Sequence, residues 1–258
     1  IQVVAINDLG SIETNAHLIK YDSTHGIINE DIQTSKDGFK ISNQEIKVFA
    51  EKDPANIPWG KVGADVVLEC TGIFLDKSSA EKHIKGGAKK VIISAPGKEV
   101  DFTIVQGVNS KELKKEHNII SNGSCTTNCL APVAMVLEKT FGISYGYMTT
   151  IHSYTGDQKL LDTLHKDLRR ARSTEGAMIP TSTGAAKAMS LVLPNLKGKL
   201  DGTAIRVPTP NVSLIDLTLV TDKEVTPESI NEAMTIAAKG DLKGILDVNK
   251  KPLVSKDF

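Results

Sequence analysis

The stretch ADVVLECTGIFLDKSSAEKHIKGGAKKVIISAP, residues 64–96, contains the strand–helix–strand pattern on which the fold prediction rests. Residues 64–70 and 89–96 are short apolar runs rich in valine and isoleucine, which is typical of strands buried on both faces. Residues 79–87, between them, follow a helical pattern that ends in two glycines. A strand, a helix and a second strand in this order indicate a parallel sheet.

The same alternation extends over the first half of the chain. Residues 2–6 form a predicted strand that ends at Asn7-Asp8, and residues 11–21 have the apolar spacing of an amphipathic helix. Residues 39–42 and 46–50 have the pattern of a β-hairpin. We therefore expect an α/β domain with a Rossmann-type, doubly wound parallel sheet.

The pattern changes after residue 124. The segments there are longer: predicted helices at roughly 127–141, 183–193 and 227–239, and alternating strands at 142–152, 203–208 and 212–220. Longer alternating strands are typical of an antiparallel sheet covered on one face. We expect an α+β domain with a mostly antiparallel sheet, and predict domains at 1–124 and 125–258.

Composition excludes several classes of protein. The chain has 258 residues, and its 31 basic residues balance its 31 acidic ones, so no net charge attracts it to nucleic acid or to a membrane. No apolar run approaches the roughly 18 residues that a membrane span needs. Cys70 lies in an apolar run, where we expect a buried, reduced thiol and hence a reducing, cytoplasmic location.

Both ends of the chain fall inside expected elements. The first residues, IQVVAIND, begin within a predicted strand and without a methionine, and the last, PLVSKDF, end without a helix or a cap. We expect the sequence to be incomplete at its N- and C-termini.

Polar residues follow several predicted strands of the first domain. In open α/β sheets ligands bind at the carboxyl ends of the strands, where Asp8, Thr71-Gly72 and Ser94 lie. Asp8 fits the position of an acidic residue that binds an adenosine ribose, although the Asn-Asp dipeptide taken alone favours a simple turn. The glycine-rich loop that should precede it by about 20 residues is not in the chain.

Two cysteines lie in SNGSCTTNCLAP, residues 121–132. A zinc site needs further ligands at suitable spacing, which the chain lacks, and a disulfide between Cys125 and Cys129 inside one helix is unusual. Cys125 falls at the start of a predicted helix, where free N–H groups and the helix dipole favour a thiolate. We predict that Cys125 is a nucleophile and that Cys129 is a packed neighbour.

A thiolate is usually paired with a base. His152 ends a predicted strand and is the candidate, whereas solvent exposure accounts for the other five histidines. Candidate anion-binding residues lie at the domain boundary and in the second domain. They are Ser124, Thr126, Thr155, Arg169, Arg170, Arg172, Ser182, Thr183, Gly184 and Arg206. Among these, Arg206 lies in an apolar strand, where a buried guanidinium requires an anionic partner.

These motifs closely resemble phosphorylating glyceraldehyde-3-phosphate dehydrogenases over nearly the whole chain. The resemblance is carried by VAIND, LIKYDSTHG, EKDPANIPW, GAKKVIISAP, SNGSCTTNCLAP, TTIHSYTGDQ, HKDLRRAR, STGAAKA and RVPTPNVS. It implies that Cys125 attacks glyceraldehyde 3-phosphate to give a thiohemiacetal, that His152 acts as base, and that NAD takes the hydride. Inorganic phosphate then cleaves the thioester to give 1,3-bisphosphoglycerate.

The resemblance also implies the binding residues. The substrate phosphate would be held by Thr155 and Arg206, and inorganic phosphate by the set Ser124, Thr126, Thr183, Gly184 and Arg170. NAD would contact Asp8, Lys52, Thr71 and Ser94, and no metal is implied. Residues 154–178 match a loop that lies between subunits in the family, which implies a homotetramer.

The sequence departs from the family in three places. Gly123 replaces a usual alanine, and both the N-terminal glycine loop and the C-terminal part that contacts the nicotinamide are missing. Three alternatives stay open: an erythrose-4-phosphate dehydrogenase, which STGAAKA disfavours; a thiol hydrolase or acyltransferase that works without NAD; and a binding protein that has kept the fold.

Overall fold

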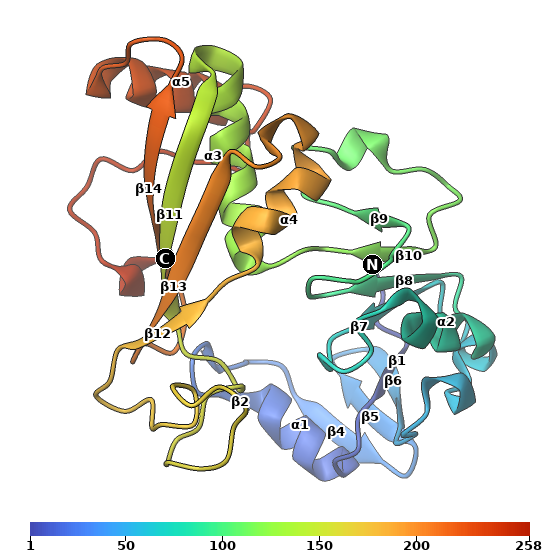
Figure 1. Cartoon of the computed structure of the whole chain (residues 1–258). Coiled ribbons are helices and arrows are strands. Elements are labelled where there is room, and N and C mark those ends of the chain that lie inside the picture. The colour runs from blue at the N-terminus through green and yellow to red at the C-terminus, as the bar shows by residue number, and fades with distance from the viewer. The chain divides into compact units, whose positions relative to one another are not determined.

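The computed structural model covers residues 1–258, the whole chain. It divides into two compact units, which are described separately (Figure 1). Unit 1 contains Ile1–Phe102 and Lys114–Asn122, and unit 2 contains Thr103–Leu113 and Gly123–Phe258. The short segment Thr103–Leu113 belongs to unit 2 because Val105 is buried in the core of that unit.

The strand–helix–strand prediction for residues 64–96 is confirmed. Strands β7 (Val66–Glu69) and β8 (Lys90–Ile93) are parallel neighbours, joined through helix α2 (Lys77–Lys85). The sheet continues through β10 (Ile119–Ser121), parallel to β8, to β9 (Phe102–Thr103). Asp76 begins α2 with a capping box, in which its carboxylate accepts from the backbone N–H of Ser79.

A second sheet of unit 1 contains the first predicted strand and the predicted hairpin. Its order is β1 (Ala5–Asn7), β6 (Gln44–Phe49), β5 (Gly38–Ile41) and β4 (Ile32–Ser35). The pair β1–β6 is parallel, and the other two pairs are antiparallel. Helix α1 (Ile12–Lys20) packs its buried Ala16 against Phe39 and Ile46 of this sheet. The α/β class predicted for this half is confirmed.

Cys70 is exposed, so the prediction of a buried thiol is wrong. Strand β7 is the edge strand of its sheet, and its residues alternate between the two faces. Val67 and Glu69 are buried, whereas Val66 and Leu68 are 47% and 66% exposed. Cys70 continues the exposed series because it lies two residues beyond Leu68.

Unit 2 contains one mixed sheet with helices on its inner face (Figure 1). The strand order is β12 (Ile179–Ser182), β13 (Leu200–Val207), β11 (Ile143–Ser153) and β14 (Ser213–Thr221). The central pair β11–β13 is parallel, and the two outer pairs are antiparallel. The sheet is therefore mostly antiparallel, as predicted.

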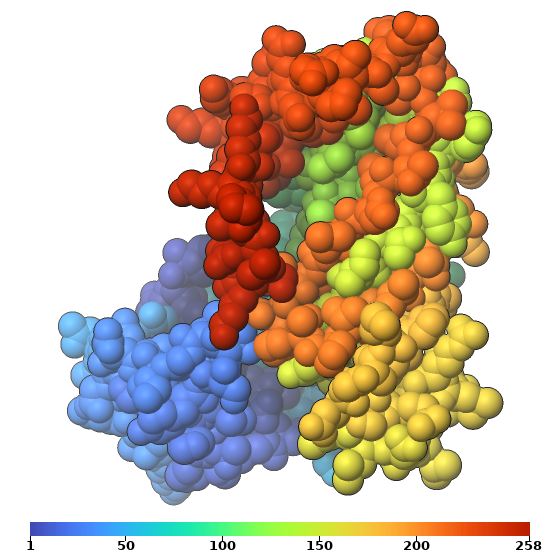
Figure 2. All heavy atoms as spheres, turned by 90° about the vertical axis from the view of Figure 1, so that its left-hand side faces the viewer, coloured from blue at the N-terminus to red at the C-terminus, as the bar shows by residue number.

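The helices of unit 2 are α3 (Cys125–Phe141), α4 (Ala185–Val192) and α5 (Pro227–Lys239). Leu130 of α3, Met189 of α4 and Met148 of β11 are fully buried in one core. On the opposite face the side chains of β11 and β14 are open to solvent (Figure 2). Tyr147 of β11 and Leu214 of β14 are among the exposed ones. Packing in this core therefore fixes the position of α3, including its first residues, relative to β11.

The remaining elements are short. They are the hairpin β2 (Tyr21–Asp22) and β3 (Gly26–Ile27), and the 3₁₀ turns η1 (Pro54–Asn56), η2 (Trp59–Val62), η3 (Ser110–Glu112), η4 (Pro194–Leu196) and η5 (Ser255–Asp257). No helix in the chain combines the length and the apolar character that a membrane crossing requires.

Asp101 ties the start of β10 to α2. Its carboxylate accepts from the backbone N–H groups of Asn118 and Ile119 at 2.8 and 2.9 Å, and from Lys77 Nζ at 2.6 Å. Burial alone would raise the pKa of Asp101, but these hydrogen bonds prevail and lower it to about 2. The ionised carboxylate therefore stabilises the fold above the pKa of an unfolded Asp, about 3.9, and this contribution is lost as the pH falls towards 2.

We predict that Asp101→Asn lowers the free energy of unfolding by about 2 kcal/mol at pH 7. Urea unfolding measured between pH 7 and pH 2.5 should show the difference from the parent protein shrinking below about pH 4. Asp65→Asn, which removes an exposed ion pair with Lys89, is the matched control and should cost much less than Asp101→Asn. A difference that does not depend on pH would contradict this role for Asp101.

Candidate active site

Cys125 is the first residue of α3, as predicted. Ser124 caps the helix: its Oγ accepts from the backbone N–H of Thr127 at 3.0 Å. The chain enters the cap through Gly123, whose φ of 64° lies in the left-handed region. Glycine adopts this conformation without strain, so the departure from the family's alanine fits the local backbone. The thiol of Cys125 therefore lies at the positive end of a helix of 17 residues.

His152 contacts Cys125 directly. The distance between Cys125 Sγ and His152 Nε2 is 3.1 Å. His152 is buried near the end of β11, where β13 and β14 pair with it on both sides. The hydrogen bond to His152 is the largest influence on the thiol; it outweighs burial and lowers the pKa of Cys125 to about 7. The same hydrogen bond raises the pKa of His152. Both shifts favour a thiolate–imidazolium pair near neutral pH.

The second ring nitrogen of His152 has two competing neighbours. The carbonyl oxygen of Ser153 and Arg206 Nη1 each lie 2.7 Å from Nδ1. A guanidinium can only donate, so it requires a lone pair on Nδ1, whereas the carbonyl requires a hydrogen there. The imidazolium carries a hydrogen on Nδ1 and can therefore bond only to Ser153. Arg206 Nη1 also donates to Ser153 O at 2.9 Å, and it can keep this bond whether or not Nδ1 of His152 carries a hydrogen.

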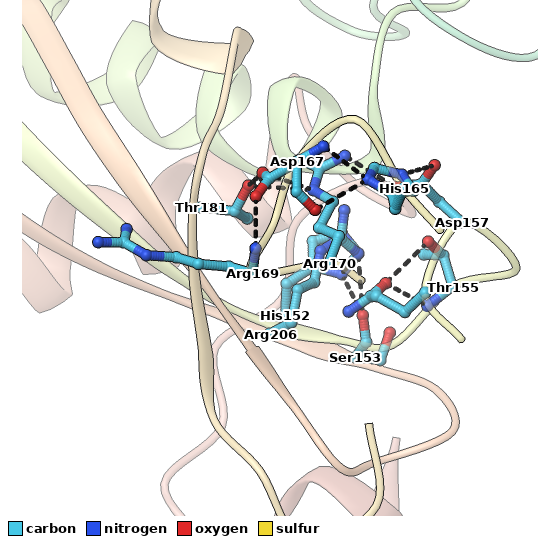
Figure 3. Close-up of polar contacts among 11 residues, drawn as sticks. His152, Ser153, Thr155, Asp157, His165, Asp167, Arg169, Arg170, Thr181 and Arg206 are labelled. Atoms are coloured by element: carbon cyan, nitrogen blue, oxygen red, sulfur yellow. Dashed lines mark hydrogen bonds and ion pairs between the residues drawn. The ribbon is translucent and has the colours of Figure 1, made fainter. Parts of the chain in front are cut away.

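Arg206 is a half-buried cation beside this pair. It lies on β13 opposite His152 of β11, and the two side chains are adjacent in Figure 3. Arg206 is in none of the ion pairs of the chain, and its Nε is buried without a hydrogen-bond partner. Burial and the nearby Arg170 lower the pKa of Arg206. A half-buried guanidinium without a carboxylate partner favours an anionic ligand, and anion binding by Arg206 remains a prediction.

A cavity of about 470 Å³ opens beside the thiol, entirely within unit 2. Cys125, Thr126, His152 and Thr155 line it, which brings four predicted site residues together. Cys129 also lines this cavity and is exposed, so its prediction as a packed residue is wrong. The residues around the cavity still shield the thiol group partly from water, and this desolvation, followed by the neighbouring Cys125, raises the pKa of Cys129, which therefore keeps its proton at neutral pH.

The other predicted phosphate ligands are not among the residues lining this cavity. Arg170 Nη1 donates to Asp157 Oδ2 at 2.8 Å, and its Nε and Nη2 donate to Thr181 Oγ1 (Figure 3). Thr183 accepts from the N–H of Ala185 at the start of α4, where Gly184 is the N-cap. The Ser124 hydroxyl is used in the cap described above. The inorganic phosphate site thus remains a prediction.

Sequence reasoning missed the roles of two histidines and one aspartate. His83 is buried and His165 half-buried, so solvent exposure does not account for them. His165 Nε2 lies 3.2 Å from Asp157 Oδ1, and Asp157 also pairs with Arg170 (Figure 3). In the sequence, the signal for this cluster of charged side chains was Asp157, which lies two residues after Thr155 in HSYTGDQ.

The predicted cofactor residues of unit 1 follow strand ends, and all are exposed. Asp8 follows β1, Thr71 follows β7 and Ser94 follows β8, while Lys52 comes shortly after β6. One oxygen of Asp8 accepts from the N–H of Gly10 at 2.7 Å, so Asp8 does begin a turn. Its second oxygen has no partner in the structure and can accept from a ribose hydroxyl. The roles of these four residues in NAD binding remain predictions.

Comparison with known proteins identifies the family. Residues 1–77 match the model for the NAD binding domain of glyceraldehyde 3-phosphate dehydrogenase, and residues 124–258 match the model for its C-terminal domain. The chain is 57% identical to glyceraldehyde-3-phosphate dehydrogenase 1 of Bacillus cereus, with all of this chain and 78% of the relative covered. It is 56% identical to the Geobacillus stearothermophilus enzyme, with all of this chain and 77% of that relative covered. The chain belongs to the glyceraldehyde-3-phosphate dehydrogenase family.

Proposed function

We propose that the protein catalyses the NAD-dependent oxidative phosphorylation of glyceraldehyde 3-phosphate to 1,3-bisphosphoglycerate. The observation that carries this proposal is the 3.1 Å contact between Cys125 Sγ and His152 Nε2, next to a guanidinium that has no carboxylate partner. The relatives bear the same enzyme name, and neither the erythrose-4-phosphate alternative nor an NAD-independent hydrolase gains support from them. We further propose that residues 1–124 bind the cofactor and that residues 125–258 hold the catalytic groups.

The reaction begins at the thiolate of Cys125. Its sulfur attacks the aldehyde carbon, and the imidazolium of His152 protonates the developing alkoxide, which gives a thiohemiacetal. His152 Nε2 then takes back the hydroxyl proton as a hydride leaves the same carbon. Bound NAD supplies the acceptor for that hydride. Inorganic phosphate attacks the resulting thioester, which forms the acyl phosphate and regenerates the thiolate.

His152 can act as this base only while Nδ1 carries a hydrogen. The Ser153 carbonyl, 2.7 Å away, accepts that hydrogen and holds the ring with Nε2 towards the sulfur. Arg206 must then release Nδ1, since two N–H groups cannot bond to each other. The phosphate of the substrate offers Arg206 a charged acceptor in place of the ring nitrogen.

We assign the substrate phosphate to Arg206 and Thr155, and the inorganic phosphate to Ser124, Thr126, Thr183, Gly184 and Arg170. The unpaired Nε of Arg206 supports the first assignment. For the second, the start of α4 offers free N–H groups, but Arg170 must exchange its bond with Asp157 for one with phosphate.

We also propose a homotetramer in the reducing cytoplasm. The loop at 154–178 exposes a set of large apolar side chains: Leu160, Leu161, Leu164, Leu168 and Met178 are each at least 73% exposed. Such a patch is typical of a protein interface. All three cysteines are free, which fits a reducing compartment.

We predict that iodoacetamide alkylates Cys125 with a pH midpoint of about 7. His152→Asn should move this midpoint towards that of a free cysteine, about 8.5, because the hydrogen bond to His152 is the main cause of the low pKa. Mass spectrometry of the labelled protein gives the site and the rate at each pH. Cys129→Ser is the control and should keep the midpoint near that of the parent, whereas preferential labelling of Cys129 would overturn the assignment.

We predict that Arg206→Met lowers kcat/KM for glyceraldehyde 3-phosphate by about 100-fold, the effect of losing charged hydrogen bonds. For glyceraldehyde without phosphate, the loss should be less than about tenfold, because that substrate offers the guanidinium no charged partner. Steady-state formation of NADH measures both values. Equal losses for the two substrates would show that Arg206 does not bind the phosphate.

A further inference from the structure

A buried chain of hydrogen bonds in unit 1 takes no part in the mechanism described above. His83 lies between Trp59 and Glu69: Trp59 Nε1 donates to His83 Nδ1 at 3.1 Å, and His83 Nε2 lies 2.8 Å from Glu69 Oε2. All three residues are buried, and the Glu69 side chain is only 2% exposed. A carboxylate and an imidazole buried in the interior of unit 1 require an explanation.

The direction of every hydrogen bond in this chain is fixed. The indole N–H can only donate, so His83 Nδ1 accepts and His83 Nε2–H donates to Glu69. The other carboxylate oxygen of Glu69 accepts from both the backbone N–H of Thr71, at 2.7 Å, and the Thr71 hydroxyl. Each donor therefore points towards Glu69, whose two oxygens are both occupied. Burial opposes the charge, but the bonds from His83 and Thr71 prevail and lower the pKa of Glu69.

This row of hydrogen bonds ends in the turn that follows β7. Thr71 Oγ1 also accepts from the N–H of Ile73 at 3.1 Å, and Gly72 between them has a φ of 72°. Glu69 thus holds three consecutive residues in a defined conformation at the carboxyl end of a parallel strand, where ligands of such sheets bind. Thr71 and Gly72 themselves are exposed, so a ligand can reach them.

We propose that Glu69 and His83 are positioning residues for NAD: they fix the Thr71–Ile73 turn, against which the cofactor binds. This rests on the proposed function in taking Thr71 as a cofactor contact. Neither residue touches the cofactor, because both are buried behind the turn. Their contribution is to fix the turn before binding, so that less ordering is required when the cofactor arrives.

The test uses substitutions that either break or keep the direction of the hydrogen bonds. Glu69→Gln introduces an amide NH₂ into a site where every neighbour is already a donor. His83→Leu leaves Glu69 Oε2 without its partner. In His83→Gln the side-chain carbonyl can accept from Trp59 while the amide donates to Glu69, so this variant keeps the direction of both hydrogen bonds. Val91→Ala is the control for lost stability, because Val91 is fully buried in the neighbouring β8 and is bonded to none of these side chains.

NAD affinity of the intact protein, measured by calorimetry, is the main readout. Glu69→Gln and His83→Leu should each raise the Kd about tenfold, which corresponds to roughly 1.4 kcal/mol. Both should retain kcat at saturating NAD within about threefold, since the turn acts on binding. His83→Gln should recover most of the affinity. Val91→Ala should leave the Kd unchanged even where its melting temperature falls as far as in Glu69→Gln and His83→Leu. Unchanged Kd values in both Glu69→Gln and His83→Leu would overturn the proposal.

A second readout does not need the cofactor. Hydrogen exchange at the amides of Thr71 and Ile73 should be about tenfold faster in Glu69→Gln than in the parent, and unchanged in Val91→Ala. Trp59 is the only tryptophan, so its fluorescence should shift in His83→Leu and stay near the parent value in His83→Gln. A parent protein that fails to bind NAD would overturn the proposed function, whereas unchanged amide exchange in Glu69→Gln would overturn the positioning role.

Discussion

The hydrogen bond between Cys125 Sγ and His152 Nε2 joins the first residue of α3 to the end of β11. Both elements pack into the same core, through Leu130 of α3 and Met148 of β11, so the 3.1 Å distance is fixed by packing rather than by a flexible loop. The contact lowers the pKa of the thiol to about 7 and raises that of the imidazole. A nucleophile and a base near neutral pH follow from this one contact.

The charges around this pair have a second consequence. Arg206 and the Ser153 carbonyl compete for His152 Nδ1, and only the bond to Ser153 leaves Nε2 free to take a proton. In the proposed mechanism, the phosphate of the substrate would resolve the competition, because a phosphate binds a guanidinium more strongly than a ring nitrogen does. If Arg206 binds the phosphate as proposed, phosphate binding and the basicity of His152 are linked through this one side chain.

Sequence patterns predicted the elements with long, regular periodicity and the residues that carry chemistry at their ends. Cys125 and His152 could be paired because the sequence places one at a helix start and the other at a strand end, where side chains that carry chemistry commonly lie. The predictions for Cys70 and Cys129 were wrong, since burial depends on which strand lies at a sheet edge and on where a cavity opens. The short strands β4 and β12 were missed, as were the buried bonds of His83, because single-sequence patterns carry no information on partners distant in the chain.

The covalent intermediate on Cys125 tests the central claim most directly. Mixing the protein with NAD and glyceraldehyde 3-phosphate in the absence of inorganic phosphate stops the reaction at the thioester. The account predicts a burst of NADH stoichiometric with the enzyme, an acyl adduct located on Cys125 by mass spectrometry, and its release when phosphate is added. An adduct on another residue, or steady turnover without any adduct, would contradict the account.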